Sequence, residues 1–315
     1  SLFDTGPKTF KNGRIRMRKS DYWPVFVTLL ALTGCGSGGS SGVGAGVGST
    51  PTPSDYPKLT DATAATALST NAVRFETRRL NNASTPTTSA QRSSVEISFD
   101  SISKSYTVRG IPASGGTTSV EQVFGPSNMI ENSGTYDKTT SAGGTTTVSR
   151  LTAGTSISYQ YTDFGIWTTG SSGGSDQIFN SIYFSYGVRT RASDMPRTGS
   201  ANYTLDLVGG GTGAPITGSG QLQANFASQT VDVSLTPAYV YRAGPNGTST
   251  IATLTGSGAI TSSDSSFAAA ISGGGYTGTV NGLFYGPAAA EVGGTFLITS
   301  PSSDVIAAGA LLGKR

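Results

Sequence analysis

Apolar and polar positions alternate through the second half of the chain, and this alternation predicts β-strands. Leu205 and Leu207 in Ala201–Val208 are separated by a polar residue, and the same two-residue period recurs in Ile216–Phe226 and Gln229–Leu235. Because successive side chains of a strand point to opposite faces, this period indicates strands with one buried and one solvated face. Five further strands are expected, at Thr248–Ile260, Phe267–Ile271, Tyr276–Tyr285, Glu291–Ile298 and Val305–Leu311.

Eight strands in residues 199–315 are the number that closes a small antiparallel barrel filled by its own side chains. Turns are expected at Ala227-Ser228 and at Gly273-Gly274-Gly275. A barrel embedded in the outer membrane would alternate in the same way, with its apolar face toward lipid. Phe267–Ile271 is short for a membrane-crossing strand of about 9–11 residues, which favours a barrel surrounded by water.

Residues 58–198 form a second region that is also rich in predicted strands. We expect a short helix at Thr60–Thr70, a loop at Thr168–Asp176, and strands in the segments Ala72–Thr77, Val95–Asp100, Ser105–Arg109, Thr145–Leu151, Ile157–Trp167 and Ile178–Val188. The last two of these are the densest in aromatic residues. Core packing with cross-strand pairs is the favoured interpretation of these rings, and an exposed face for a ligand or partner is the alternative.

The composition agrees with an all-β protein, since 44 residues are Gly and only 12% are charged. The formal net charge of +3 is misleading, because residues 1–34 hold six Lys or Arg against two Asp. The remaining chain has 15 basic and 16 acidic residues, a net charge of −1. No basic field is left to bind phosphates, so we expect no nucleic-acid partner.

The residues that usually carry catalysis are scarce. The chain has no histidine and a single cysteine, Cys35, so a Ser-His-Asp or Cys-His device is absent. The carboxylates show no spacing typical of paired acid–base work, as at Asp163, Asp176, Asp194, Asp206 and Asp232. The glycine-rich runs lack the βαβ context of a dinucleotide loop. We therefore predict neither an enzyme nor a cofactor, a metal or a catalytic residue.

The beginning of the chain is typical of a secretion signal. A positive segment, Met17-Arg18-Lys19, precedes a mainly apolar run of about ten residues that is too short to span a membrane. Leu32-Thr33-Gly34-Cys35 then resembles the bacterial lipobox, in which the thiol is diacylated and the chain is cut before the cysteine. We predict a signal peptide over 1–34, with Met17 as the true start, and a lipidated Cys35 followed by a Gly/Ser tether to residue 57.

One stretch near the C-terminus carries a family resemblance. Gly282–Phe296 reads GLFYGPAAAEVGGTF, with its marked positions at Gly282, Phe284, Gly286, Pro287, Glu291, Gly293, Gly294 and Phe296. It resembles the C-terminal barrel signature of transferrin-binding protein B-like surface lipoproteins, a group that includes relatives of factor H-binding protein. Asp194–Tyr203 is similar to the entry into that barrel.

The resemblance implies an all-β protein with an N-terminal handle-like region and a C-terminal eight-stranded antiparallel barrel. It also implies a lipid anchor in the bacterial outer membrane, exposure at the cell surface, and export by an outer-membrane translocon. Some relatives capture host iron proteins, haem or other host factors together with a receptor. This chain has one handle-plus-barrel unit instead of two lobes, so transferrin itself does not follow as the ligand.

Two functions remain open at this stage. The first is a lipid-anchored outer-membrane protein that captures a host protein, haem or another solute without catalysis. The second is a structural or interaction lipoprotein of the cell envelope that has no solute ligand. Glu291, the one charged residue of the signature, is expected to have a structural role, by accepting backbone N–H bonds or pairing with an Arg. The ligand-contacting residues stay unassigned.

Overall fold

A computed structural model describes residues 56–63, 66–79, 87–110, 119–130, 134–142, 145–153, 158–173, 176–241, 247–302 and 304–315. The predicted signal peptide and the lipobox residues Leu32, Thr33, Gly34 and Cys35 lie outside the described residues. Tyr56, which the tether prediction included, is packed: its ring is buried, and its hydroxyl donates to Asp194 Oδ2 over 2.7 Å. In the described part of the chain, no helix is long and apolar enough to cross a membrane.

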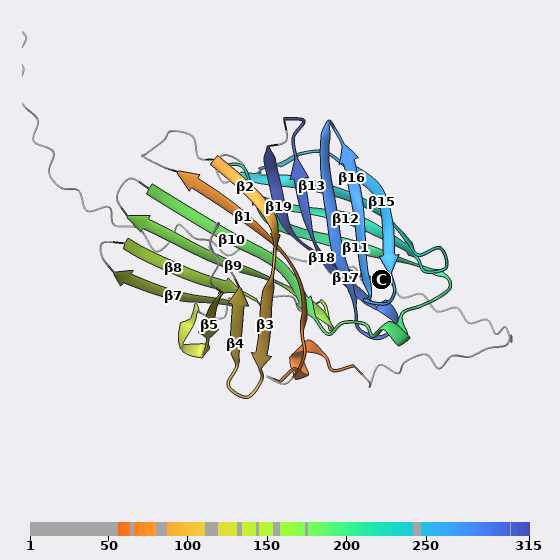
Figure 1. The fold of residues 1–315 in the computed structure, drawn as a ribbon, viewed down its shortest axis with the longest axis horizontal. Coiled ribbons are helices and arrows are strands. Elements are labelled where there is room, and N and C mark those ends of the chain that lie inside the picture. Colours follow the sequence, from red (N-terminus) through yellow and green to blue (C-terminus); the bar gives the residue numbers. More distant parts are fainter. Residues whose placement is uncertain are drawn as a thin grey trace, which may run out of the picture. The chain divides into compact units, whose positions relative to one another are not determined.

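The C-terminal part of the chain folds as a closed eight-stranded antiparallel barrel (Figure 1). Its strands are β11 (Ser200–Gly211), β12 (Pro215–Asn225), β13 (Thr230–Tyr241), β15 (Leu254–Thr261), β16 (Ser266–Gly273), β17 (Tyr276–Tyr285), β18 (Glu291–Thr299) and β19 (Val305–Lys314). Each strand pairs with the next, and β19 pairs with β11 to close the ring. The predicted fold class is confirmed.

One predicted barrel strand, residues 248–260, is two strands in the structure. The short β14 (Gly247–Thr250) pairs with the end of β13, and β15 pairs with its first half. Between them, residues 251–253 lie opposite the two residues 236 and 237 of β13. Pro237 has no N–H to give to the ladder, so a bulge is tolerated at this point.

The barrel interior holds the main hydrophobic core. Toward one end of the barrel, Phe284 makes ring contacts with Tyr203, Phe226 and Phe267. Tyr203 is fully buried, and its hydroxyl donates to the carbonyl of Ala289 over 2.6 Å. On β11 the inward positions are buried and the outward ones exposed over its first seven residues. The outward side chains are polar there, the opposite of a wall that faces lipid.

The N-terminal part of the chain contains two antiparallel sheets. The larger one, here the handle sheet, has the order β2 (Thr87–Ser93), β1 (Ser69–Arg79), β10 (Asp176–Gly187), β9 (Thr162–Gly173), β8 (Thr145–Thr152), β7 (Thr135–Ala142) and β6 (Met129–Ile130). The smaller sheet has the order β3 (Val95–Asp100), β4 (Ser105–Gly110) and β5 (Val120–Phe124). A second core between them includes Trp167, Phe184 and Phe124.

Two sequence predictions for this region are wrong. The expected helix at residues 60–70 is reduced to one 3₁₀ turn, η2 (Leu59–Asp61), and β1 already begins at Ser69. The β-branched threonines of this segment favour the extended chain over a helix. The expected strand at 157–167 starts only at Thr162, and residue 157 lies outside the described residues.

The predicted loop at residues 168–176 is also wrong, because most of it belongs to the hairpin of β9 and β10. Small residues there serve packing instead of a turn. Gly170 lies opposite Phe179, and a Cβ atom built on Gly170 would lie 2.8 Å from the Phe179 ring. The lack of a side chain at Gly170 thus leaves room for a large cross-strand ring.

The handle sheet packs against the outer wall of the barrel through small residues. Ala308 and Ala310 point outward from β19 and form a buried cluster with Val73, Phe75 and Tyr183 of the handle sheet. A Cβ atom on Gly210 of β11 would lie 2.8 Å from the Tyr183 hydroxyl oxygen. Alanine and glycine on the barrel therefore allow the two walls to approach closely enough to bury large side chains.

This interface predicts loss of stability at alkaline pH. Burial raises the pKa of Tyr183 to about 12, from an ordinary value of 10.0. The unfolded chain therefore ionises first, so stability is fully present below pH 10 and falls as pH rises toward 12. For this one side chain the loss is about 2–3 kcal/mol. Tyr183→Phe should reduce that loss, measured by urea unfolding at pH 7 and between pH 10 and 11.5.

The matched control is Tyr241→Phe, because the Tyr241 side chain is half exposed. We expect this variant to follow the pH dependence of the unchanged protein. Equal losses in both variants would show that the buried Tyr183 hydroxyl does not govern alkaline stability.

Candidate functional site

The signature stretch forms a hairpin from β17 through η5 (Pro287–Ala289) to β18, and it packs against the chain that leaves the handle. Gly286 has a φ of 70°, and its N–H donates to the Val188 carbonyl over 2.9 Å. A Cβ atom on Gly286 would lie 2.4 Å from the Tyr161 ring. This position thus requires glycine for both its conformation and its close contact.

Strand β18 is buried on both faces. Its inward residues, among them Val292 and Phe296, belong to the barrel core. On its outward face, Thr295 donates from Oγ1 to Asn71 Oδ1 over 2.6 Å. A Cβ atom on the outward Gly293 would lie 2.8 Å from Ser185 Cβ, whereas one on Gly294 would meet the Asn281 carbonyl at 2.4 Å. Gly293 therefore allows close contact with the handle, and Gly294 allows close contact with the neighbouring strand β17.

Glu291 begins the outward row of β18 and binds the handle backbone directly. Its Oε1 accepts from the N–H of Gln160 at 2.8 Å, and its Oε2 accepts from Tyr161 at 2.8 Å and from Thr162 at 3.0 Å. Burial raises the pKa of the Glu291 carboxyl, while these three donors and the cross-strand Lys314 oppose that rise. A carboxylate with three backbone donors holds the start of β9 on the barrel.

The residues before β9 continue this attachment. Lys314 donates from Nζ to the Ser158 carbonyl over 3.4 Å and lies 5.9 Å from the centre of the Tyr159 ring. The Tyr159 hydroxyl donates to Asp206 Oδ2 over 3.0 Å, and burial followed by the nearby Asp206 charge raises the pKa of this tyrosine. Tyr159 therefore contributes to the join between handle and barrel.

The aromatic residues of the handle are mostly core, which agrees with the favoured sequence interpretation. Trp167, Phe184 and Tyr186 are each at most 2% exposed. Trp167 also satisfies its polar atom by donating from Nε1 to Ser149 Oγ over 2.9 Å. Phe179 is the exception in this group, with 41% of its surface exposed. One ring does not make an aromatic binding face.

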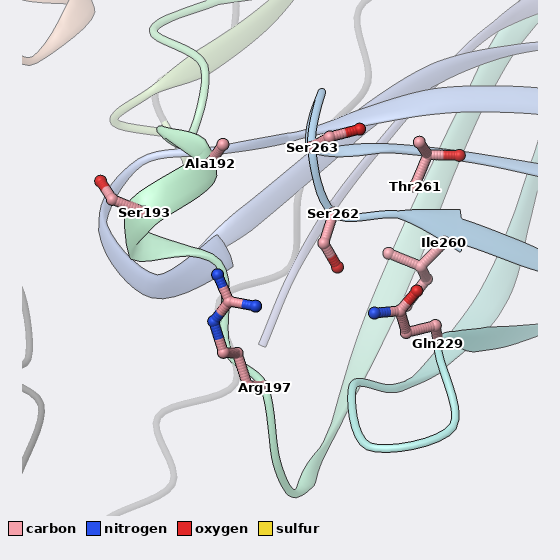
Figure 2. Close-up of a pocket in the computed structure, with 8 residues that line it drawn as sticks. All are labelled: Ala192, Ser193, Arg197, Gln229, Ile260, Thr261, Ser262 and Ser263. Atoms are coloured by element: carbon pink, nitrogen blue, oxygen red, sulfur yellow. The ribbon is translucent and has the colours of Figure 1, made fainter.

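A polar depression of about 660 Å³ lies at one end of the barrel (Figure 2). Its lining comes from four separate segments: η4 (Ala192–Asp194), Arg197 before β11, Gln229 before β13, and residues 260–263 at the end of β15. The Arg197 guanidinium points into the space between η4 and the turn that carries Ser262 (Figure 2). Hydroxyls, an amide and one cation can bind a small polar or anionic group.

Sequence reasoning did not find this depression because no motif joins its four segments. The turn around Ala227 and Ser228 was expected, but the register of the long-range pairing between β13 and β15, which brings it here, was not. At the end of that ladder the Ile260 N–H donates to the Gln229 carbonyl over 2.8 Å. Gln229 has a φ of 55°, a turn conformation that is evident only from the backbone of the structure.

The geometry defines a class of protein: a closed barrel whose wall carries a β-sheet handle, with its buried polar groups engaged in holding the two together. Residues 190–315 match the protein family described as the C-lobe and N-lobe β-barrels of Tf-binding protein B. The chain thus carries, over these residues, a barrel domain of the transferrin-binding protein B-like family.

Solved structures similar to this chain include transferrin-binding protein B from Haemophilus parasuis, as a double mutant, at 14% identity and a TM-score of 0.37, covering 79% of this chain and 76% of that one. Intact Ap-TbpB with its N and C lobes matches at 14% identity and a TM-score of 0.37, over 81% and 77%. Kievitone hydratase from Nectria haematococca matches at 10% identity and a TM-score of 0.27, over 83% and 91%. No curated protein matches the chain.

The geometry at Glu291 predicts a large stability loss from a nearly isosteric change. In Glu291→Gln an amide NH₂ replaces one acceptor oxygen and faces a backbone N–H, so at least one buried donor loses its partner. We expect a loss of about 2–4 kcal/mol in the free energy of unfolding, since bonds to charged groups contribute about 1.5–3 kcal/mol each. Chemical unfolding at neutral pH measures it.

Glu96→Gln is the matched control, because the Glu96 side chain is 75% exposed and its nearest ion-pair contact, to Arg109, is 3.6 Å long. This change should alter stability by less than about 0.5 kcal/mol. If both variants unfold at the same denaturant concentration as the unchanged protein, the Glu291 bonds do not hold the handle.

Proposed function

We propose that this protein is a non-catalytic binding protein, anchored in the bacterial outer membrane through lipid on Cys35 and exposed at the cell surface. There it captures a host protein, haem or another iron source. Its proposed partner in the outer membrane is either a receptor that acts in the capture or a translocon that exports the protein. The observation that carries the proposal is the match of residues 190–315 to the barrels of a transferrin-binding protein. The name of that family gives the class of ligand that the proposal extends to this chain.

A binding role is supported by the chemistry of the chain. No histidine is present, and Glu291, the buried carboxylate of the signature, is fully engaged with backbone donors. The polar depression beside Arg197 offers hydrogen bonds and one charge, but its lining has no carboxylate and no cysteine. Such a surface can bind a ligand, but it has no acid–base pair that could catalyse a reaction of that ligand.

The anchor is supported by the sequence Leu32-Thr33-Gly34-Cys35 behind an apolar segment. Gly36, and not Asp, follows the cysteine, which favours onward transport to the outer membrane. The Gly/Ser-rich residues from Gly36 onward form a linker whose root-mean-square reach is about 25 Å for some twenty residues. That reach holds a folded module away from the membrane surface.

The anchor is tested by Cys35→Ser in a Gram-negative host. We expect palmitate labelling and outer-membrane fractionation for the unchanged protein, and loss of both for the variant, since no other thiol exists to take the lipid. Ser41→Ala, in the same linker, is the control and should behave as the unchanged protein. Labelled Cys35→Ser protein, or unlabelled unchanged protein, would contradict the anchor. Protease treatment of intact cells tests surface exposure, which resistance of the folded module would contradict.

Ligand capture is tested with the full-length Cys35→Ser protein immobilised on resin and exposed to transferrin, haem and whole serum. We expect specific retention of one of them. The alternative function, a structural or interaction lipoprotein without a solute ligand, predicts that all three pass through while a component of an envelope extract is retained. That result would overturn the capture proposal and leave the anchor proposal intact.

A further inference from the structure

The wall of the barrel formed by β11, β12, β13 and β15 carries a row of polar side chains in register. Asn202 pairs with Gln223, Gln223 with Asp232, and Asp232 with Ser257, so these four residues follow one line across four strands. Gln221 and Ser234 are partners in the adjacent line. At about 4.8 Å between neighbouring strands, the row of four is about 14 Å long.

These six residues line a shallow groove of about 640 Å³ on the barrel wall. The lining side chains differ in length: the short Ser234 and Ser257 stand beside the longer Gln221, Gln223 and Asn202. The groove is thus shaped by side chains on a continuous ladder, and the backbone beneath it is held by paired strands on both sides.

None of the six side chains has a hydrogen bond or ion pair with another described residue. Some polar residues elsewhere on the barrel's outer surface do have partners: Asn281 accepts from Arg92 at 2.6 Å, and the hydroxyl oxygens of Thr277 and Thr299 lie 3.0 Å apart. The groove therefore presents amide and hydroxyl groups whose donors and acceptors are free for a ligand.

The chemistry of these groups defines the ligand class. Each amide offers both donors and acceptors, a carboxylate accepts, and a serine hydroxyl does either, a set that matches neighbouring hydroxyl groups on one molecule. Asp232, the one charged residue of the six, is negative, which disfavours an anionic chain. No aromatic ring lines the groove, so recognition takes place through hydroxyl groups at the edge of the ligand.

We propose that this groove binds a neutral polysaccharide. The site lies on the part of the barrel wall that the handle leaves open, and its residues take no part in the attachment of handle to barrel. The inference goes beyond the proposed capture of a host iron source and does not depend on it, because the two ligands differ in class and are tested with different probes.

Affinity electrophoresis of the full-length Cys35→Ser protein in native gels tests the proposal. Separate gels contain xyloglucan, galactomannan, mannan or dextran as neutral probes and alginate as the anionic one. We expect retardation by at least one neutral polysaccharide and none by alginate. The double variant Gln223→Ala/Asp232→Ala should weaken that retardation by about tenfold or more, because each lost side chain removes hydrogen bonds that contribute about 1 kcal/mol.

Gln177→Ala is the matched control, since Gln177 is an exposed glutamine on the handle strand β10. It should be retarded as strongly as the unchanged protein. Thermal unfolding checks that the groove variant is folded, because exposed polar substitutions change stability by about 0.5 kcal/mol or less. Three results would overturn the proposal: no retardation by any of the four neutral polymers, equal retardation of the folded double variant, or stronger retardation by alginate.

Discussion

The structure depends on a strand that has no solvated face. On the inside of β18, Val292 and Phe296 fill the barrel. On the outside, Glu291, Gly293 and Thr295 meet the handle. An antiparallel strand of a small barrel would ordinarily face water on its outer side. Here the outer side is covered, so its polar groups must find protein partners, and they find them on the handle backbone and on Asn71.

That constraint explains why the neighbouring residues are small. The handle strands can lie on β18 and β19 only where the barrel offers Gly or Ala outward, as at Gly293, Ala308 and Ala310. A close approach then removes water from the Glu291 carboxylate, which would be costly if it were unpaired. Three backbone N–H groups at the start of β9 compensate, so attachment and burial depend on the same contact.

The barrel strands could be predicted well because the sequence features that specify them are local to each strand. Alternation with period two sets which face of each strand is buried, so six of the eight barrel strands lie within three residues of their predicted bounds. Strand β13 continues six residues beyond its predicted end at Leu235. The other exception, at Pro237, is a bulge opposite a residue without an N–H. In the N-terminal region the same reasoning found β3, β4 and β8 within one residue. It missed most of the hairpin of β9 and β10, because small residues such as Gly170, which packs under Phe179, resemble a loop in sequence.

The type of hydrogen bond that Glu291 makes could be predicted from the sequence, but its donors could not. A carboxylate beside glycines favours backbone N–H bonds, but the donors, residues 160–162, lie some 130 positions earlier in the chain. No periodicity records such a long-range contact. The depression beside Arg197 escaped for the same reason, since its four segments meet only in the folded chain.

The covered and the open walls of the barrel therefore have different chemistry. Where the handle lies, polar residues such as Glu291 and Thr295 are buried and paired, and a substitution there acts first on folding. On β12, β13, β15 and the first half of β11, most outward residues are polar and the inward ones are mostly apolar, so stability rests on the inward set. The outward set is free to vary in chemistry without loss of the fold. This open wall is under little structural constraint, and unpaired amides lie on it in register. It can therefore serve in ligand recognition, because the opposite wall of the barrel packs against the handle.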